Sequence, residues 1–340
     1  MLTYTLRRLL TAIPTLLFIS LVIFLLLELA PGDPLADMPL TIPPEVREKI
    51  RLALGLGESW YVRYVLWLKN LCITEPSYWI DRSFGTNLAD GAQRIISYGT
   101  RAPVFDTIFE RLPQTLTVVG MGYVVGVLIA LPIGIISATR QYSWFDQAGT
   151  FVSMVGFSVP TFVTGVFLIL IFSIWMPRDS WFWLPSIYDT TLQVTDWDSF
   201  WKQVRQMAMP VFVLALFNAA QISRYMRASM LDNLSQDYVR TARAKGLSER
   251  VVVMKHVLRN SMIPVVTVIA LGVPGVFTGA IITENVFKVN GLGQQLLLSI
   301  QSSDAPMVLT ISFIFAVLIV LFNLIADVLY GFLDPRIRYD

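Results

Sequence analysis

Six long apolar stretches limit what this chain of 340 residues can fold into. They cover residues 9–30, 115–138, 148–175, 207–223, 263–282 and 308–329, and the fourth is the weakest because Asn218 and Gln221 interrupt its end. A helix of about 20 apolar residues crosses the hydrocarbon core of a bilayer. Charged residues make up only 15% of the chain, whereas a soluble domain carries about 25%. The sequence therefore predicts an all-α membrane protein with six transmembrane helices.

The first stretch has two interpretations, a cleaved signal peptide or a retained anchor. A signal peptide has an apolar region of roughly 7–15 residues and a cleavage site with small residues. The stretch at 9–30 is longer than that, and no small-x-small pattern precedes Pro31. We expect it to be retained as the first transmembrane helix.

The basic residues predict the orientation of the spans, because Lys and Arg are enriched in short cytoplasmic loops. They are Arg7, Arg8, Arg140, the eight Lys and Arg residues of 224–260, Arg336 and Arg338. With six spans all of these fall on one side of the membrane. We therefore expect both termini in the cytoplasm, residues 31–110 on the outer side and residues 333–340 as a cytoplasmic tail.

Two outer segments are rich in aromatic residues. Residues 43–54 begin with two prolines and continue with charged and apolar residues at helical spacing, which predicts an amphipathic helix. The aromatic residues are Trp60, Tyr61, Tyr64, Trp67, Tyr78 and Trp79, followed in the loop expected at 176–206 by Trp181, Trp183, Trp197 and Trp201. Such rings suit the headgroup level of a bilayer, and they equally suit the core of a small outer domain. The sequence leaves both interpretations open.

Single copies of two reactive residues exclude several kinds of chemistry. Cys72 is the only cysteine and His256 the only histidine, so an intrachain disulfide, a thiolate metal cluster and a zinc site with two histidines are excluded. No Lys is followed by Ser or Thr, so the chain has no Walker A loop and ATP would have to bind to another chain. The spans carry only Glu28 and Asp327, near their ends, which weighs against an ion-coupled carrier and against a membrane-embedded enzyme.

Glycines and prolines in the spans also have two interpretations. The residues are the motifs Gly122-x-x-x-Gly126 and Gly275-x-x-x-Gly279, and the prolines Pro132, Pro160 and Pro274. Glycines at this spacing let helices pack closely, and prolines free backbone groups that neighbours or water must satisfy. Ordinary packing of a helix bundle and the lining of a transport pathway both fit.

The polar segment 237–264 lies between the fourth and fifth spans. Ser235 is a reasonable N-cap for a helix with Asp237 in its first turn, and Gly246 is placed to end that helix in a left-handed conformation. Ser248 is placed to cap a second helix that leads into the fifth span. We expect the first helix to offer a partner protein a face of small side chains, framed by basic ones: Thr241, Ala242, Ala244, Arg240 and Arg243. A basic loop lying on anionic lipid is the alternative.

Several motifs resemble those of one transporter family. Residues 240–246, RTARAKG, resemble the Glu-Ala-Ala-x-x-x-Gly loop of the importer-type permease subunits of ABC transporters. Further motifs resemble the peptide-permease branch, in chain order: LAPGDP at 29–34, RLPQTL at 111–116, YVRTARAKGL at 238–247, HVLRN at 256–260, Pro264, TENVF at 283–287, GLG at 291–293 and DPRIR at 334–338. Arg240 departs from the Glu of the general loop, and Asn290 stands where the branch has Pro. The resemblance implies that residues 86–102 are an addition to the pattern of the family, with no role assigned to them.

The resemblance implies a type I importer fold and a division of labour. Residues 111–332 would form the transmembrane core, after a first helix within 1–30, and the subunit would pair with a homologous permease to form the pore. Two cytoplasmic ATPases would bind ATP and Mg²⁺, so this chain would hold no cofactor, and a periplasmic binding protein would deliver the solute. The location would be the bacterial inner membrane, with lipid as a partner. The net charge of +2 gives no reason to expect nucleic acid.

The first set of site residues follows from the same resemblance. A coupling loop within 224–260 would dock on an ATPase through Asp237, Arg240, Thr241, Ala242, Arg243, Lys245, Gly246 and Leu247. The residues themselves, rather than the resemblance, suggest four positions along the pathway: Asn218, Pro274, Thr278 and Glu284. The expected cargo is a di- or oligopeptide, with glutathione or a nickel complex as alternatives for the same machinery. An ion-coupled secondary transporter is the alternative from a different class.

Overall fold

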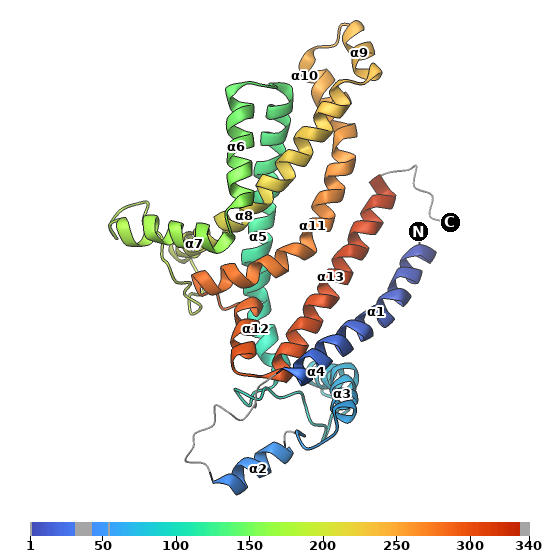
Figure 1. The fold of residues 1–340 in the computed structure, drawn as a ribbon, viewed down its shortest axis with the longest axis vertical. Coiled ribbons are helices and arrows are strands. Elements are labelled where there is room, and N and C mark those ends of the chain that lie inside the picture. The colour runs from blue at the N-terminus through green and yellow to red at the C-terminus, as the bar shows by residue number, and fades with distance from the viewer. Residues whose placement is uncertain (1, 31–42, 54, 334–340) are drawn as a thin grey trace. The chain divides into compact units, whose positions relative to one another are not determined.

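Helices make up nearly all of the regular structure (Figure 1). The computed structural model describes residues 2–30, 43–53 and 55–333, with the backbone alone at 2–4, 53, 275–279, 326 and 328–333. Within these residues no strand forms, and an isolated bridge joins Ile96 to Pro103. The prediction of an all-α protein is confirmed. The motif residues at 31–34 and 334–338 lie outside the described part of the chain.

Thirteen α-helices and three π-helical turns follow one another in the described residues. The α-helices are α1 (Leu2–Leu29), α2 (Pro44–Ala53), α3 (Trp60–Lys69), α4 (Glu75–Phe84), α5 (Val104–Thr139), α6 (Trp144–Ser158), α7 (Thr161–Ile169), α8 (Trp197–Leu234), α9 (Asp237–Ala244), α10 (Glu249–Val251), α11 (Leu258–Phe287), α12 (Leu292–Gln301) and α13 (Ala305–Leu333). The π-helical turns are η1 (Asn70–Thr74), η2 (Leu170–Trp175) and η3 (Val252–Val257).

Five of the described helical stretches are long and apolar enough to cross a membrane, and a sixth span exists if one bent pair counts as one. The pair consists of α6 and the helix formed by α7 and η2, which meet at an angle of 101°. A single continuous span at 148–175 was therefore the wrong prediction. Pro160 supplies the reason, because proline forces the residue before it away from the helical region, and Val159 accordingly has φ −83° and ψ 124°.

Helix α8 begins at Trp197, well before the start predicted at 207. Asp196 accepts a hydrogen bond from the backbone N–H of Ser199 (2.7 Å), and the Ser199 hydroxyl accepts one from the N–H of Asp196 (3.0 Å). This capping box begins the helix upstream of its apolar run. Trp197 and Trp201 therefore lie on a helix, and their assignment to a loop up to residue 206 was wrong.

The chain divides into two compact units. Unit 1 comprises Met1–Leu9, Gln114–Gln294 and Leu318–Asp340, and unit 2 comprises Leu10–Pro113 and Gln295–Val317. These units reflect compactness alone, so the domain bounds expected at 30, 110 and 332 stay a prediction.

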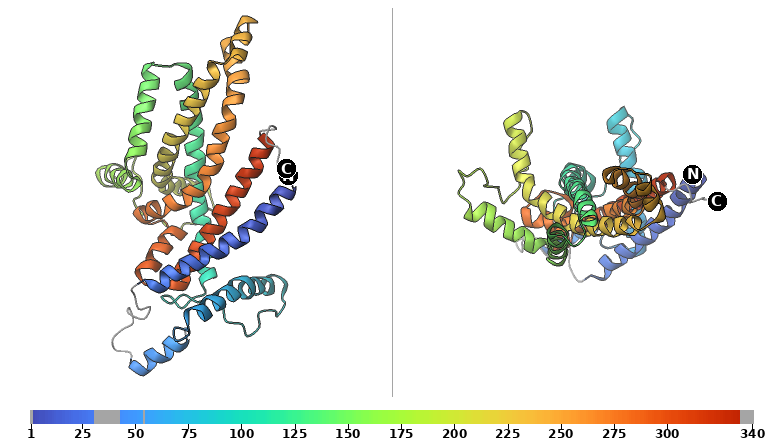
Figure 2. Two further views of the ribbon diagram at one scale, coloured as in Figure 1. Left: turned by 45° about the vertical axis from the view of Figure 1, so that its right-hand side comes forward. Right: turned by 90° about the horizontal axis from the view of Figure 1, so that it is seen from above.

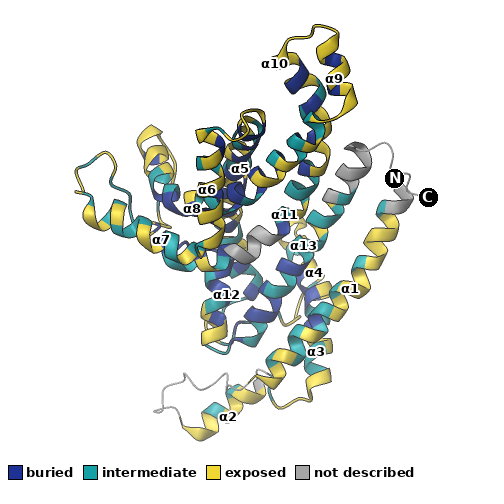
Figure 3. Cartoon of the chain, turned by 45° about the horizontal axis from the view of Figure 1, so that its top comes forward, coloured by how far each residue is buried: buried dark blue, intermediate teal, exposed yellow. Residues whose placement is uncertain are grey.

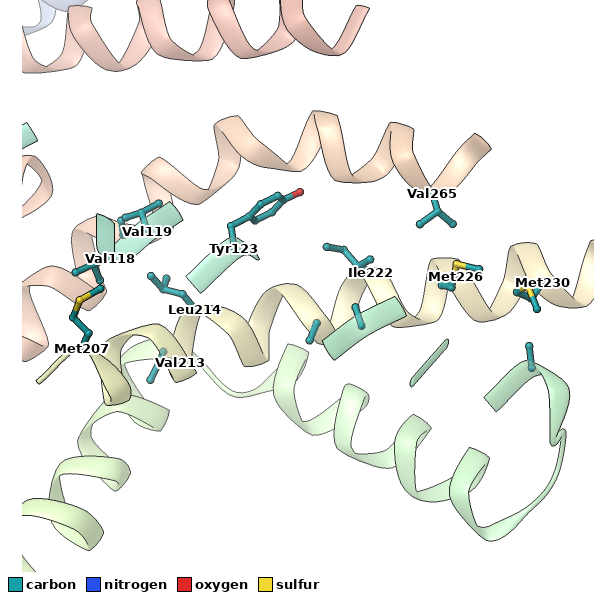
Figure 4. Close-up of a cluster of buried hydrophobic side chains, with 14 of the residues drawn as sticks. Val118, Val119, Tyr123, Met207, Val213, Leu214, Ile222, Met226, Met230 and Val265 are labelled. Carbon is teal, nitrogen blue, oxygen red and sulfur yellow. The ribbon is translucent and has the colours of Figure 1, made fainter. Parts of the chain in front are cut away.

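The core of unit 1 forms where α5, α8 and α11 meet (Figure 4). Met226 and Met230 from α8 are fully buried, as is Val118 from α5. The ring of Tyr123 on α5 lies between the helices, and its hydroxyl donates a hydrogen bond to the carbonyl of Ile269 on α11. The buried hydroxyl of Tyr123 therefore has a hydrogen-bond acceptor in place of water.

Small residues at every fourth position of α5 let α8 approach closely. Added Cβ atoms would lie 2.6 Å from Leu214 Cβ at Gly122, 3.0 Å from the Ala215 oxygen at Gly126 and 2.6 Å from Met226 Cβ at Gly134. Ala130, between the last two, is fully buried. The packing interpretation is confirmed for the first glycine motif. Gly275 and Gly279 of the second motif lie where only the backbone is described.

Gly134→Ala is expected to lower the apparent melting temperature of the protein in detergent. The added methyl group would lie 2.6 Å from Met226 Cβ and 2.8 Å from the backbone oxygen of Ser223, so α5 and α8 would have to separate. Overpacking of this kind costs about 1–3 kcal/mol. Gly120→Ala on the same helix is the matched control, because nothing lies within 4 Å of its added Cβ. Equal melting temperatures for the two variants would contradict the prediction.

Unit 2 contains the predicted amphipathic helix and the aromatic residues that follow it. The helix expected at 43–54 is confirmed as α2. Trp67 is buried, donates a hydrogen bond from Nε1 to Thr310 Oγ1 (3.2 Å) and packs edge-on against Phe313. Trp60 and Tyr61, by contrast, are exposed. Trp67 therefore fits the interpretation as the core of a small outer domain. Trp60 and Tyr61 leave open the other interpretation, rings at the headgroup level of the bilayer.

The segment 86–102, which had no assigned role, forms hydrogen bonds to α4, to α5 and to the residue before α13, all within unit 2. Arg94 donates hydrogen bonds to Glu75 (2.9 Å) and to Asp106 (3.0 Å), which lie on α4 and α5. A few residues later the backbone N–H of Tyr98 donates to the buried carboxylate of Asp304 (2.9 Å), just before α13. These three carboxylates hold the segment through hydrogen bonds. Burial also raises the pKa of the Tyr98 hydroxyl.

Candidate coupling surface and pathway residues

The predicted coupling loop folds into a short helix that ends at a glycine. Gly246 has φ +78°, a conformation that side chains other than glycine rarely adopt. Its N–H bonds to the carbonyl of Arg243 (2.9 Å), and the N–H of Leu247 bonds to the carbonyl of Ala242 (3.4 Å). These two bonds form a Schellman motif, which satisfies the last carbonyls of α9. The predicted left-handed cap at Gly246 is confirmed.

One cap in this region was predicted at the wrong residue. Ser235 completes the end of α8, where its hydroxyl donates to the carbonyl of Asp232 (2.9 Å). Gln236 is the N-cap of α9 and makes no side-chain cap bond. Because α8 continues to Leu234, Ser235 is the C-cap of α8 and cannot also be the N-cap of α9. Ser248 precedes α10 as expected.

The faces of α9 are assigned by burial (Figure 3). Val239 is fully buried and Ala242 is 6% exposed, and both belong to the same core as Val252 and Val257 of η3. The expectation that Ala242 faces a partner is therefore wrong, because α9 needs two inward side chains to pack on η3. Thr241 and its neighbours on the outer side remain exposed.

The outer side of this turn, here called the coupling surface, consists of exposed polar and small residues: Asp237, Tyr238, Arg240, Thr241, Arg243, Ala244, Lys245, Gly246 and Leu247. Arg243 makes two hydrogen bonds to Glu249 (2.6 and 3.0 Å) across the glycine turn. That carboxylate raises the pKa of the Arg243 guanidinium. Arg240 lies 3.5 Å from Asp237, an exposed pair that contributes little to stability. Arg240 and Lys245 are the cations left facing outward.

The coupling surface stands on a braced pair of helices. α8 and α11 pack along each other, and α9 lies at one end of the pair (Figure 1). The hydroxyls of Ser229 and Ser261 each donate to the backbone carbonyl of the other residue (2.9 and 3.2 Å). Ser261 is buried and Ser229 half-buried, so these bonds join α8 to α11 away from most of the solvent.

A buried ion pair in unit 1 was not anticipated from the sequence. Asp146, at the start of α6, accepts two hydrogen bonds from Arg227 on α8 (2.6 and 2.8 Å) and is buried. The basic count of 224–260 treated Arg227 as a loop residue, whereas it lies on the helix. The signal in the sequence was Ser143 three residues before Asp146, which is the spacing of a helix cap.

The predicted pathway residues are brought into different surroundings. Asn218 is buried, and its amide donates to the carbonyl of Leu214 on its own helix (2.7 Å). Pro274 is a buried residue inside α11. Thr278 lies on the same helix, where its side chain is outside the described part of the structure. Their roles along a pathway stay predictions.

Glu284 is enclosed by residues from two motifs noted in the sequence. Its side chain is 1% exposed and accepts hydrogen bonds from the Thr115 hydroxyl (2.8 Å) and from the N–H of Gln294 (3.0 Å). Thr115 in turn accepts from the N–H of Leu292 (2.7 Å). A Cβ atom at Gly291 would collide with the carboxylate. The carboxylate therefore caps the N-terminus of α12, where the helix dipole favours negative charge.

Comparison with known proteins decides the family. The family described as "Binding-protein-dependent transport system inner membrane component" matches residues 130–339, and its N-terminal companion, "Binding-prot-dependent transport system membrane comp, N-term", matches residues 1–119. The chain belongs to this family of binding-protein-dependent permeases. It is therefore a multi-pass component of the inner membrane and a transport component rather than an enzyme. Such a component works with an ATPase and a substrate-binding partner.

Relatives resemble the chain over its full length. The oligopeptide transport system permease protein AppB of Bacillus subtilis (strain 168) is 38% identical over 343 residues, covering all of both chains. The glutathione transport system permease protein GsiC of Escherichia coli (strain K12) is 35% identical, again over all of both chains. A solved structure described as an amino acid ABC transporter has a TM-score of 0.50 at 15% identity, covering 67% of this chain and 94% of that one. This last likeness supports the fold alone and agrees with a type I importer arrangement.

Proposed function

We propose that the protein is the pore-forming permease subunit of an ATP-driven importer for di- and oligopeptides. The observation that carries the proposal is the braced, exposed turn at Gly246 in a chain of this family. Relatives named for oligopeptides, dipeptides and glutathione cover all of their own length and of this chain. Glutathione is itself a tripeptide, so it falls within the same class of cargo.

The coupling surface acts as the contact with a cytoplasmic ATPase. A short helix can enter a groove of a partner and be moved as a rigid body. The Schellman motif fixes the direction in which the chain leaves α9, and the bonds between Ser229 and Ser261 join α8 to α11. Closure of the ATPases around ATP would thereby tilt the packed helices of unit 1.

The proposed assembly contains one homologous permease and two ATPase subunits, with a periplasmic binding protein on the outer side. Both termini face the cytoplasm, together with the coupling surface. The support for this orientation is the concentration of Lys and Arg around the surface. The exposed Arg240 and Lys245 belong to that concentration.

Uptake of a labelled tripeptide into proteoliposomes is expected to require ATP and the binding protein. The assay uses the assembled complex, with ATP enclosed on the side of the coupling surface. Since the chain has few charges in its spans, an ion gradient without ATP is expected to drive no uptake. Uptake with the gradient alone would instead identify a secondary transporter. ATP-dependent uptake of a nickel complex without uptake of peptide would support the ATP-driven importer but would contradict a peptide as its substrate.

A further inference from the structure

We propose that the helix formed by α3, η1 and α4 lies in the plane of the membrane interface and binds lipid through one apolar face. The helix continues from Trp60 to Phe84, because the π-helical turn η1 joins α3 directly to α4. At about 1.5 Å per residue it is roughly 35 Å long. This helix is here called the transverse helix.

One side of the transverse helix is apolar and exposed. The exposed apolar residues on this side are Tyr61, Val65, Cys72, Ile73, Ile80 and Phe84. Leu66 is also exposed, but at about 100° per residue it lies off this side. Val65 is 60% exposed and Phe84 79%. In an α-helix, residues four apart drift about 40° around the axis at each step, at about 100° per residue. The wider π-helical turn η1 rotates less per residue than an α-helix. This smaller rotation offsets the drift, so Ile80 and Phe84 lie on the same side of the helix as Tyr61 and Val65.

The opposite side of the transverse helix is fixed to membrane-spanning helices of the same unit. Trp67 bonds to Thr310 in the first turns of α13, and the hydroxyl of Tyr64 bonds to Ser20 on α1 (2.8 Å). Both α1 and α13 are long and apolar enough to cross a membrane. The transverse helix is therefore held at the membrane by contacts on its buried side.

Arg63 on the transverse helix also pairs with Glu28 near the C-terminal end of α1. A carboxylate in a membrane-spanning helix is costly unless it is paired or reaches the interface. The pair therefore places this part of the transverse helix at the end of α1, where the membrane interface lies.

The direction of the transverse helix agrees with an interfacial position. In Figure 1, α3 and α4 are seen nearly end-on while α1 runs across the picture, and in the view from above in Figure 2 the transverse helix extends away from α1. A helix attached crosswise to a membrane span lies along the membrane. Amphipathic helices of this kind bury their apolar face in the boundary between headgroups and acyl chains.

Lipid is the occupant that fits the surroundings of this face. The neighbouring surface of α1, with Phe18, Leu26 and Leu29, is apolar and exposed as a span in lipid requires. That surface and the apolar face of the transverse helix belong to the same unit, and both are exposed. Trp60 and Tyr61 lie at one end of it, and rings of this type are enriched at the headgroup level. The exposed Lys69 can extend its ammonium group into water while its stem stays apolar.

The native Cys72 offers a direct test, because it is the only cysteine and lies on the apolar face. A nitroxide spin label is attached to it in the full complex, with cysteine-free partner subunits, in proteoliposomes of phosphatidylethanolamine and phosphatidylglycerol. Power-saturation measurements compare collisions with oxygen, which concentrates in lipid, and with a water-soluble nickel chelate. Collisions with oxygen are expected to dominate at Cys72, and equally at a label in the double variant Cys72→Ser, Val65→Cys.

The matched control is the double variant Cys72→Ser, Asp90→Cys, because Asp90 is exposed in the loop after α4. The ratio of oxygen to chelate accessibility at Cys72 is expected to exceed that at position 90 several-fold. Equal ratios would show a face in water and overturn the proposal. Weak collisions with both reagents at Cys72 would show a face covered by another protein, which overturns it as well. ATP-dependent uptake is read separately, so failure here is distinguishable from failure of the transport function.

Discussion

Replacing Gly246 by tryptophan is expected to abolish peptide uptake while the protein still inserts into the membrane. The φ of +78° at this position strains any residue with a side chain, at a cost of about 1–3 kcal/mol. Nothing within the chain lies within 4 Å of an added Cβ, so the indole would project from the coupling surface. Its effect would therefore fall on the partner that binds there. ATP hydrolysis by the assembled complex should continue without transport.

Two milder substitutions separate backbone strain from bulk. Gly246→Asn is expected to transport at close to the wild-type rate, because asparagine tolerates the left-handed conformation better than other side chains. Gly246→Ala introduces strain without bulk and should lie between the two. Rates are measured as ATP-dependent uptake into proteoliposomes beside ATP hydrolysis. Wild-type uptake by the tryptophan variant would reject the docking role of this surface.

Glu284→Ala is expected to destabilise the protein severely. The substitution leaves the Thr115 hydroxyl and the N–H of Gln294 without their buried acceptor. Each unsatisfied buried group costs about 1–3 kcal/mol, and acceptors that carry charge are worth more than neutral ones, so the total loss is about 3–5 kcal/mol. The change is measured as a drop in apparent melting temperature in detergent, together with reduced recovery of folded protein.

The conservative variants decide between a positioning role and a pathway role for Glu284. Glu284→Gln keeps the shape of the side chain but only one of the two acceptor oxygens that Thr115 and Gln294 use, so it is expected to recover part of the stability lost by Glu284→Ala. Thr115→Ser keeps the hydroxyl and should be close to wild type, whereas Thr115→Val should share the defect. A Glu284→Gln variant with wild-type stability but no uptake would place the carboxylate on the transport pathway. A Glu284→Ala variant with unchanged melting temperature would reject the positioning role.

Much of the fold could be predicted, because apolar runs of membrane length have few alternatives to a helix. The predictions failed where a local signal competed with the apolar pattern. Pro160 breaks a run that composition alone presents as continuous, and the capping box at Asp196 begins α8 before its apolar run. In both cases backbone geometry prevailed over hydropathy.

The candidate site could be predicted only in part, for a similar reason. The left-handed cap at Gly246 follows from local chain geometry, which a sequence expresses directly. The inward position of Ala242 depends on where η3 lies, and helical spacing does not contain that information. The contact between Thr115 and Glu284 joins residues far apart in the chain, although each lies in a motif that the sequence made visible.

The amino-acid sequence by itself determined the class of the protein, most of its membrane-spanning helices and the glycine turn of its coupling surface. These depend on hydrophobicity and on backbone preferences, which act over a few residues. Only the tertiary structure decided which buried polar groups have partners, as it did for Glu284 with Thr115 and for Asp146 with Arg227. The physical reason is that a buried polar group is satisfied by whichever helix packs beside it, and packing is a property of the whole unit.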